Sequence, residues 1–181
     1  MGSEMCIRDR VEIISAILKA GGSGADRFRG QLRGLLVDGR ALTTAHLLLG
    51  YDAWESGKLD EARLHWERAL ESDPRSAVVA NNLAWALASG PNPDPARGLK
   101  LIDLALDGNP KEPDLLGTRG RILARLGRWK EALAALEAVL PARPESRELH
   151  ADLATVYAAL GSPELAEQHR RLADRPAPPA R

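Results

Sequence analysis

The feature that most constrains this chain is a set of residues that recur every 34 to 36 positions. A first series of small residues, at spacings of 36, 34 and 34, comprises Ala62, Gly98, Ala132 and Ala166. Two further series keep these spacings, one at Ala69, Ala105, Val139 and Ala173 and one at Pro74, Pro110, Pro144 and Pro178. This period is typical of stacked units that cannot bury their apolar faces alone.

The stretch from residue 46 to 74 shows what one unit contains. It is predicted to form two antiparallel helices joined by a tight turn. Gly57 is expected to end the first helix, because glycine readily takes the left-handed conformation found at helix C-termini. Asp60 is predicted to cap the second helix, and Pro74 to close it, since proline lacks an amide hydrogen. Turn glycines at the same place in later units are Gly127 and Gly161.

The second unit replaces the turn glycine with a longer segment at residues 89–95, which accounts for the spacing of 36. Asp94 before Pro95, and Ser162 before Pro163, are predicted to cap the helices that follow, because a capping side chain followed by proline favours a helix start.

The two ends of the chain differ from these units. Residues 2–10, GSEMCIRDR, resemble a translated sequencing-library adapter. We therefore expect residues 1–10 to be a non-native leader on a bacterial metagenomic fragment, with Cys6 not a native thiol. Residues 11–42 are predicted to form a degenerate helical pair, with helices over 11–20 and 25–37 separated by a break at 21–24. Residues 174–181 are expected to be a disordered proline-rich tail.

Composition excludes several classes of function. Apolar residues make up 44% of the chain but aromatic residues only 4%, which favours helices over sheets. Lysine plus arginine and aspartate plus glutamate both number 25, so no net field attracts nucleic acid or an anionic membrane. No apolar run approaches the roughly 20 residues of a membrane span.

The residue types that carry chemistry form no catalytic constellation in this sequence. The four histidines are two pairs of equivalent repeat positions: His46 with His150, and His65 with His169. None has the i, i+4 spacing of a metal site on one helix. We interpret the histidines as a product of the repeat. The chain is therefore expected not to be an enzyme and to hold no metal or cofactor.

The period and its small residues resemble the tetratricopeptide repeat (TPR) family. The residues that carry the resemblance are Leu49, Gly50, Ala62, Trp66, Ala69 and Pro74, then Leu83, Ala84, Leu87, Ile102, Ala105 and Pro110, then Gly120, Leu123, Ala132, Leu136 and Pro144, and finally Leu153, Ala154, Tyr157, Ala166 and Ala173. The family implies an all-α, right-handed α-solenoid of antiparallel helix pairs. Its four repeats would cover residues 43–173, as 43–76, 77–112, 113–146 and 147–173. Arg170 departs from the pattern, which a solvent-facing last helix would explain.

The resemblance also implies a binding groove, because the first helices of TPR repeats line a concave surface. Carried over by position, the groove residues are Tyr51, Trp54, Asn81, Asn82, Trp85, Thr118, Arg121, Arg125, Asp152 and Thr155. Arg121 and Arg125 lie four apart and would engage a partner carboxylate. In the alternative interpretation, Asn81 and Asn82 tie neighbouring helices together and Trp85 belongs to the core.

One specific TPR function is not expected. In the clamp that holds chaperone tails, lysine and asparagine stand where this chain has Leu47 and Tyr51, and basic residues stand where it has Asp114 and Thr118. Only Asn82 fits that clamp.

The leading functional hypothesis is a non-enzymatic scaffold that binds a peptide or helix of a protein partner in this groove. The rival is the C-terminal TPR region of a larger, N-terminally truncated enzyme or secretion component. Self-association is a third possibility. The compartment stays open, with the cytoplasm as the default.

Overall fold

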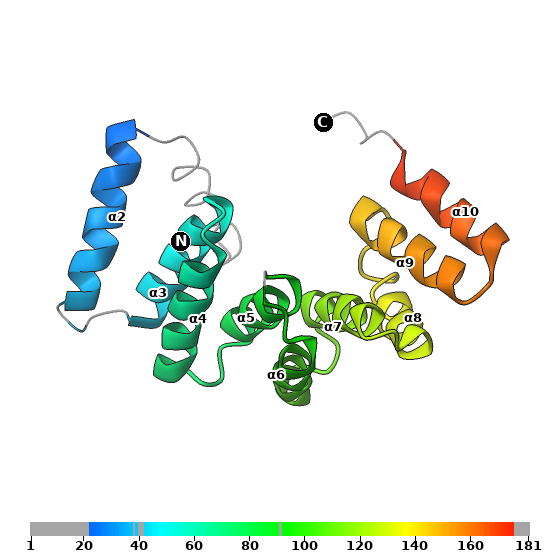
Figure 1. The fold of residues 1–181 in the computed structure, drawn as a ribbon, viewed down its shortest axis with the longest axis horizontal. Coiled ribbons are helices and arrows are strands. Elements are labelled where there is room, and N and C mark those ends of the chain that lie inside the picture. The colour runs from blue at the N-terminus through cyan, green and yellow to red at the C-terminus, as the bar shows by residue number, and fades with distance from the viewer. Residues whose placement is uncertain (1–21, 38, 40–41, 91, 176–181) are drawn as a thin grey trace, which may run out of the picture. The chain divides into compact units, whose positions relative to one another are not determined.

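The computed structural model describes residues 22–37, 39, 42–90 and 92–175, and these fold entirely into α-helices and their connections (Figure 1). The expected leader at residues 1–10, the helix expected over residues 11–20 and most of the expected tail lie outside the described residues. The all-α repeat fold predicted from the sequence is confirmed.

The described chain divides into two compact units, which we treat separately. The first contains α2 (Gly22–Val37), α3 (Leu42–Glu55), α4 (Leu59–Ser72) and α5 (Ala77–Ser89) as far as Ala86. The second contains the end of α5, then α6 (Pro95–Gly108), α7 (Pro113–Arg125), α8 (Trp129–Glu137), α9 (Arg147–Ala159) and α10 (Pro163–Ala173).

Helix α2 packs its apolar stripe on α3. Leu32 is buried with Leu48 and Leu49 of α3, and Phe28, Leu35 and Leu36 pack against this cluster, as on one face of an amphipathic helix. The break predicted at residues 21–24 is wrong for Gly22 to Gly24, which form the first turn of α2. Glycine lowers helix propensity by only about 1 kcal/mol, and packing of the stripe outweighs that cost.

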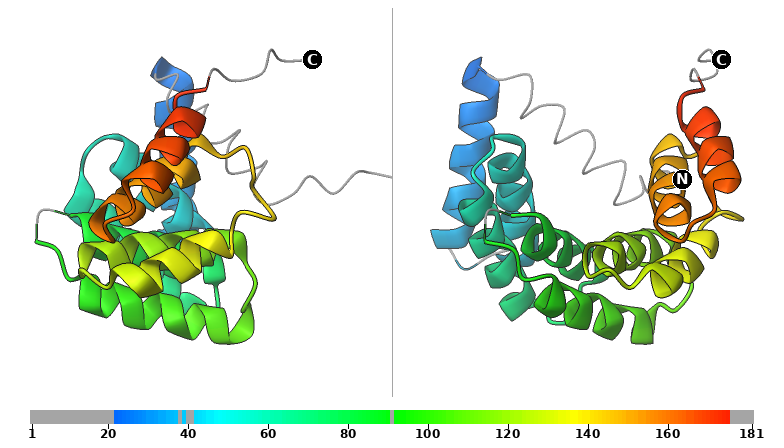
Figure 2. Two further views of the ribbon diagram at one scale, coloured as in Figure 1. Left: turned by 90° about the vertical axis from the view of Figure 1, so that its right-hand side faces the viewer. Right: turned by 45° about the vertical axis from the view of Figure 1, so that its right-hand side comes forward.

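Helices α3 and α4 form the hairpin expected around residues 46–74, and they pack closely against each other (Figure 2). Gly57 has a φ of 74°, as predicted for the turn. The capping role predicted for Asp60 is wrong, because α4 begins at Leu59 and Lys58 holds the N-cap position. Asp60 instead lies in the first turn, where its charge favours the helix dipole.

The crossing of α3 and α4 depends on a missing side chain. A Cβ atom placed on Gly50 would lie 2.3 Å from Nε1 of Trp66, so only glycine lets the indole lie against the α3 backbone. Trp66 is 2% exposed, and its Nε1 donates to the carbonyl oxygen of Leu47 at 3.2 Å. The first repeat is therefore fastened through one buried tryptophan.

The second unit repeats this design with smaller side chains. A Cβ atom on Gly120 would lie 2.6 Å from Cγ of Leu136, which is fully buried. Asp94 caps α6, where its side chain accepts from the backbone amide of Arg97 at 2.9 Å, as predicted. Ser162 holds the N-cap position of α10, but its side chain makes no capping hydrogen bond.

Helix α8 ends at Glu137 and is therefore shorter than the repeat pattern suggests. Pro141 has no amide hydrogen and disfavours helical geometry at the residue before it. The chain continues as hydrogen-bonded turns, with the amide of Arg143 donating to the carbonyl of Val139 at 3.0 Å. In α10, Arg170 is exposed, as expected for a solvent-facing final helix.

Candidate functional site

In the first unit, the expected groove residues lie on two helices. Tyr51 and Trp54 come from α3, and Asn81, Asn82 and Trp85 come from α5. All five side chains are partly exposed. We call these five residues the aromatic–amide patch.

The rings of the patch stand on the buried tryptophan of α4. The Tyr51 ring meets Trp66 edge-on, with 5.8 Å between ring centroids and an angle of 80°. Trp54 lies against the same indole at 5.8 Å and 39°. Because Trp66 is itself fixed by a hydrogen bond and by close contact with α3, the two outer rings are held in place before any partner arrives.

The amides of the patch behave differently from each other. Nδ2 of Asn82 donates to the hydroxyl of Tyr51 at 2.8 Å, which ties α5 to α3. Asn82 therefore already has the helix-tying role that the alternative interpretation gave it. Among the described residues, Oδ1 of Asn81 is the buried side-chain polar atom that lacks a hydrogen-bond partner. An asparagine amide offers both a donor and an acceptor, which suits a peptide backbone.

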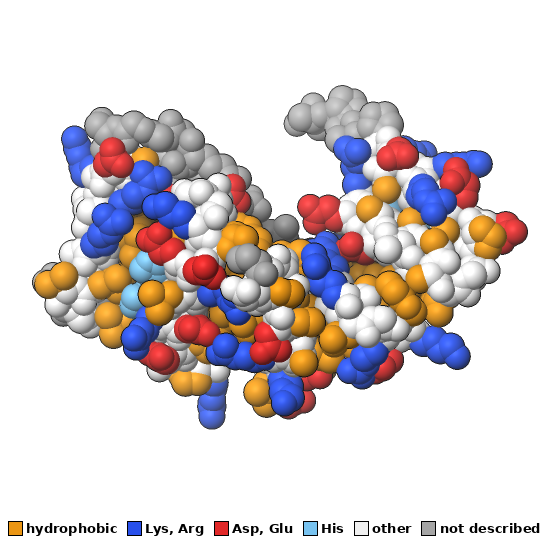
Figure 3. All heavy atoms as spheres, viewed as in Figure 1, with side chains coloured by type: hydrophobic (Ala, Val, Ile, Leu, Met, Phe, Trp, Pro, Cys, Tyr) orange, Lys and Arg blue, Asp and Glu red, His pale blue; other side chains and the backbone are white. Residues whose placement is uncertain are grey.

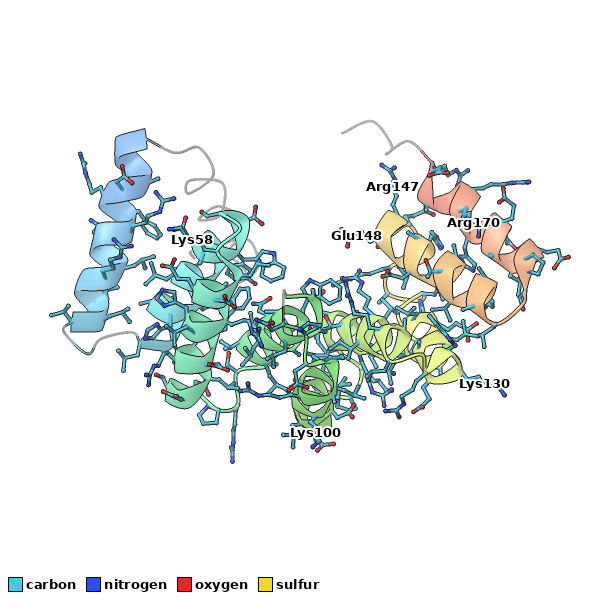
Figure 4. The ribbon with its side chains drawn as sticks, viewed as in Figure 1. Lys58, Lys100, Lys130, Arg147, Glu148 and Arg170 are labelled. Atoms are coloured by element: carbon cyan, nitrogen blue, oxygen red, sulfur yellow. The ribbon has the colours of Figure 1, made fainter. Side chains whose placement is uncertain are left out.

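In the second unit, the residues expected to line the groove mostly engage one another. Nε of Arg121 donates to Oδ2 of Asp152 at 2.5 Å. Nη2 of Arg121 lies 3.4 Å from Oε2 of Glu148, which is at the start of α9 (Figure 4). Burial raises the pKa of Asp152, and the hydrogen bond from Arg121 opposes that rise. Arg121 was expected to receive a partner's carboxylate, but it already holds two from its own chain.

The other three groove positions of this unit vary in exposure. Thr118 is only 5% exposed, so a partner has little of its side chain to touch. Thr155 is exposed, and its hydroxyl donates to the carbonyl of Ala151 at 3.0 Å. Arg125 is exposed at the end of α7.

The positions that would form the chaperone-tail clamp have other tasks. Leu47 is 8% exposed and its carbonyl receives the Trp66 indole hydrogen. Asp114 forms an ion pair of 2.7 Å with Arg143. Both residues are thus engaged in contacts within the chain.

Two contacts between histidines went unrecognised in the sequence. Nδ1 of His46 lies 2.9 Å from Nδ1 of His65, and Nδ1 of His150 lies 3.0 Å from Nδ1 of His169. Each contact joins the two helices of one repeat. Figure 3 shows histidine side chains at the surface of the first unit, among apolar neighbours. The signal was present, since both members of the first pair recur at the same repeat positions in the fourth repeat.

In the described part of the chain, no three or more histidine, cysteine, aspartate or glutamate side chains are placed to share a metal ion. No helix in this part of the chain is long and apolar enough to span a membrane.

Comparison with known families matches the tetratricopeptide repeat twice, over residues 47–113 and over residues 87–151. Together these matches run continuously through the regions of both units described above. The chain belongs to the tetratricopeptide-repeat family.

Solved structures show the same fold. A crystal structure of MamA is 19% identical, with a TM-score of 0.68 and 94% of each chain covered. The first TPR of Spaghetti (RPAP3), bound to the HSP90 peptide SRMEEVD, is 25% identical, with a TM-score of 0.61, 66% of this chain and 94% of that chain covered.

A curated relative is much longer than this chain. A probable cation-transporting ATPase I of Mycobacterium tuberculosis is 35% identical over a region that covers 47% of this chain. That region is 6% of the ATPase, so the chain spans only a small part of the curated relatives it matches.

Proposed function

We propose that this chain is a non-enzymatic scaffold that binds an extended peptide or a helix of a partner protein at the aromatic–amide patch. The observation that carries the proposal is the contact of the two outer aromatic rings of the patch with a buried tryptophan. Tyr51 and Trp54 are partly exposed rings held by the buried Trp66. Rigid aromatic side chains of this kind are common anchors in protein interfaces, because little conformational entropy is lost when a partner covers them.

The chemistry of the patch favours a peptide over a small molecule. Its partly exposed groups come from successive turns of two helices, which suits an elongated ligand. Asparagine amides can pair with both the N–H and the C=O of a peptide unit.

The experiment selects peptides from a display library on the wild-type chain and measures dissociation constants. Trp54→Ala is expected to weaken a selected peptide by about tenfold or more, because hot-spot aromatics typically contribute over 1 kcal/mol. Leu104→Ser is the matched control, since Leu104 is 70% exposed on α6 outside the patch. Unchanged affinity for Trp54→Ala, or an equal loss for Leu104→Ser, would refute the patch as the binding face.

A second pair of variants separates binding from helix tying. Tyr51→Phe removes the hydroxyl that Asn82 contacts but keeps the ring. If Asn82 also contacts the partner, Asn82→Ala weakens the peptide more than Tyr51→Phe does, while both lower stability similarly. Equal affinities in the two variants would assign Asn82 to structure alone.

The peptide SRMEEVD provides a negative test. We expect no specific binding of it, because Leu47 and Asp114 occupy positions where the chaperone-tail clamp has basic side chains. Binding that Asn82→Ala abolishes would contradict this expectation.

The relation to a much longer ATPase favours one alternative, that this chain is the repeat region of a larger enzyme or secretion component. The two candidates differ in what the intact gene encodes upstream of Val11. A start codon within a few dozen residues supports the free scaffold, and a catalytic domain supports the alternative.

A further inference from the structure

The two histidine contacts have nearly the same geometry. The rings of His46 on α3 and His65 on α4 have centroids 5.2 Å apart at an angle of 43°. Those of His150 on α9 and His169 on α10 are 5.1 Å apart at 37°. In both pairs the facing atoms are the two Nδ1 nitrogens. A hydrogen bond between two such nitrogens needs one proton, and a second proton destroys it.

The fourth repeat shows where the protons lie. Nε2 of His150 is 2.9 Å from the carbonyl oxygen of Pro144, which only accepts, so this nitrogen donates. In neutral His150, Nδ1 is then an acceptor, and Nδ1 of His169 must carry the shared proton. After one further protonation, His150 donates from both nitrogens and His169 accepts through Nδ1 as its other tautomer. The contact therefore survives the first added proton.

The hydrogen bond between the two Nδ1 atoms does not survive a second added proton. Both Nδ1 atoms then carry hydrogen and face each other at hydrogen-bond distance, with two like charges and no acceptor between them. We propose that the first and fourth repeats are closed by proton-sensitive histidine clasps, His46–His65 and His150–His169, which open when both imidazoles of a pair are protonated. Each clasp holds the two helices of its own repeat together.

Charged groups of both signs act on the first clasp. Arg33 of α2 and Arg68 of α4 oppose protonation, whereas Glu61 and Glu71 of α4 favour it. Burial is the largest influence, and it lowers the pKa of both histidines.

Around the second clasp, the groups that act are Glu137 of α8 and Tyr157 of α9. The Tyr157 ring stacks on His169 with an angle of 12°, and its hydroxyl donates to Glu137 at 2.6 Å. That hydrogen bond raises the pKa of Tyr157 to about 12, so the tyrosine stays neutral. Burial lowers the pKa of His169, with the charge of His150 next in importance and Glu137 opposing.

The sign of the pH dependence follows from these lowered values. The unfolded chain binds protons at the ordinary histidine pKa of about 6.5. In the folded chain His46, His65 and His169 bind them less readily, because burial lowers their pKa. The stability of both repeats is therefore fully present above pH 6.5. It is lost as the pH falls below 6.5 and passes through the lowered pKa values of the folded state.

The chain contains its own apolar version of the clasp. In the third repeat, the positions equivalent to His150 and His169 are Leu116 and Ala135. An apolar pair cannot titrate, so the third repeat should not respond to pH in this range. The double variant His150→Leu with His169→Ala thus installs the residues that the third repeat has at these positions.

The test is amide hydrogen exchange by mass spectrometry at pH 7.5 and 5.0, expressed as protection factors and with EDTA present, because imidazole pairs also bind transition metals. In the wild type, protection of α9 and α10 should fall by about threefold to tenfold, the equilibrium worth of one hydrogen bond. Protection of α7 and α8 should change by less than about twofold. The double variant should lose the pH response in α9 and α10 and keep it in α3 and α4.

Two results would overturn the clasp. One is a double variant that keeps the wild-type pH response in α9 and α10. The other is a pair of identical tautomers for His150 and His169 at pH 7.5 in ring-nitrogen NMR, where we expect Nε2–H on the first and Nδ1–H on the second. If the double variant does not fold, His169→Gln replaces it, because glutamine can donate to His150 but does not titrate.

Discussion

Gly50→Ala tests the packing of the first repeat with a single added carbon atom. The new Cβ would lie 2.3, 2.6 and 2.8 Å from three atoms of the Trp66 ring, where ordinary contact begins near 3.4 Å. Overpacking of this kind costs roughly 1–3 kcal/mol. Displacing the indole also weakens its hydrogen bond to Leu47, worth about 1 kcal/mol. Alanine recovers about 1 kcal/mol of helix propensity. The net expectation is a loss of about 1–3 kcal/mol in the free energy of unfolding.

The assay is urea unfolding followed by circular dichroism, with Gly117→Ala as the matched control. Gly117 lies within α7, and a Cβ there would meet nothing within 4 Å. This control should gain up to about 1 kcal/mol. Because Trp66 supports Tyr51 and Trp54, Gly50→Ala should also weaken peptide binding.

A double variant isolates the contact itself. The second repeat has Ala84 and Ile102 at the positions of Gly50 and Trp66. In a Trp66→Ile background, Gly50→Ala should therefore cost less than about 0.5 kcal/mol or be stabilising. If Gly50→Ala is as stable as the wild type, or if its cost is the same in both backgrounds, Trp66 does not need glycine at position 50.

Three further variants test other contacts. Asp94→Ala should lower stability by about 0.5–2 kcal/mol through loss of the α6 cap, while Asp94→Asn retains most of it in the same urea assay. Arg29→Lys should cost about 1 kcal/mol, because lysine cannot reproduce the two bonds of 2.7 Å to Asp52 that join α2 to α3; protease protection of α2 measures this. Ala132→Arg should unfold at least the third repeat, since Ala132 is fully buried beside Gly120, and an unchanged helical melting curve would contradict this.

Local signals predicted the framework of the fold well. The positive φ at Gly57, Gly127 and Gly161 follows from glycine at a fixed place in the repeat. The cap at Asp94 follows from an acidic residue before proline. The prediction that Asp60 caps α4 failed because the turn at Gly57 makes the helix start earlier. Asp60, a residue type favoured at the N-cap, therefore lies two positions beyond the actual N-cap at Lys58.

The contacts within the candidate site were harder to predict, because they join different helices. Histidine spacing along one helix does not reveal these contacts, because His46 and His65 are 19 residues apart on two antiparallel helices. The exposure of a groove residue depends on the rotation of its helix by about 100° per residue, so Thr118 is buried while Arg121 reaches Asp152. Sequence position alone does not determine which carboxylate pairs with a given arginine.

The central proposal is that a partner binds the aromatic–amide patch of the first unit. The most direct measurement is a ¹H–¹⁵N NMR titration of the labelled chain with a selected peptide. We expect the largest shifts at Tyr51, Trp54, Asn82 and Trp85, including the side-chain amide and indole signals. Shifts concentrated on exposed residues of α4, such as Leu64, with the patch unchanged would contradict it.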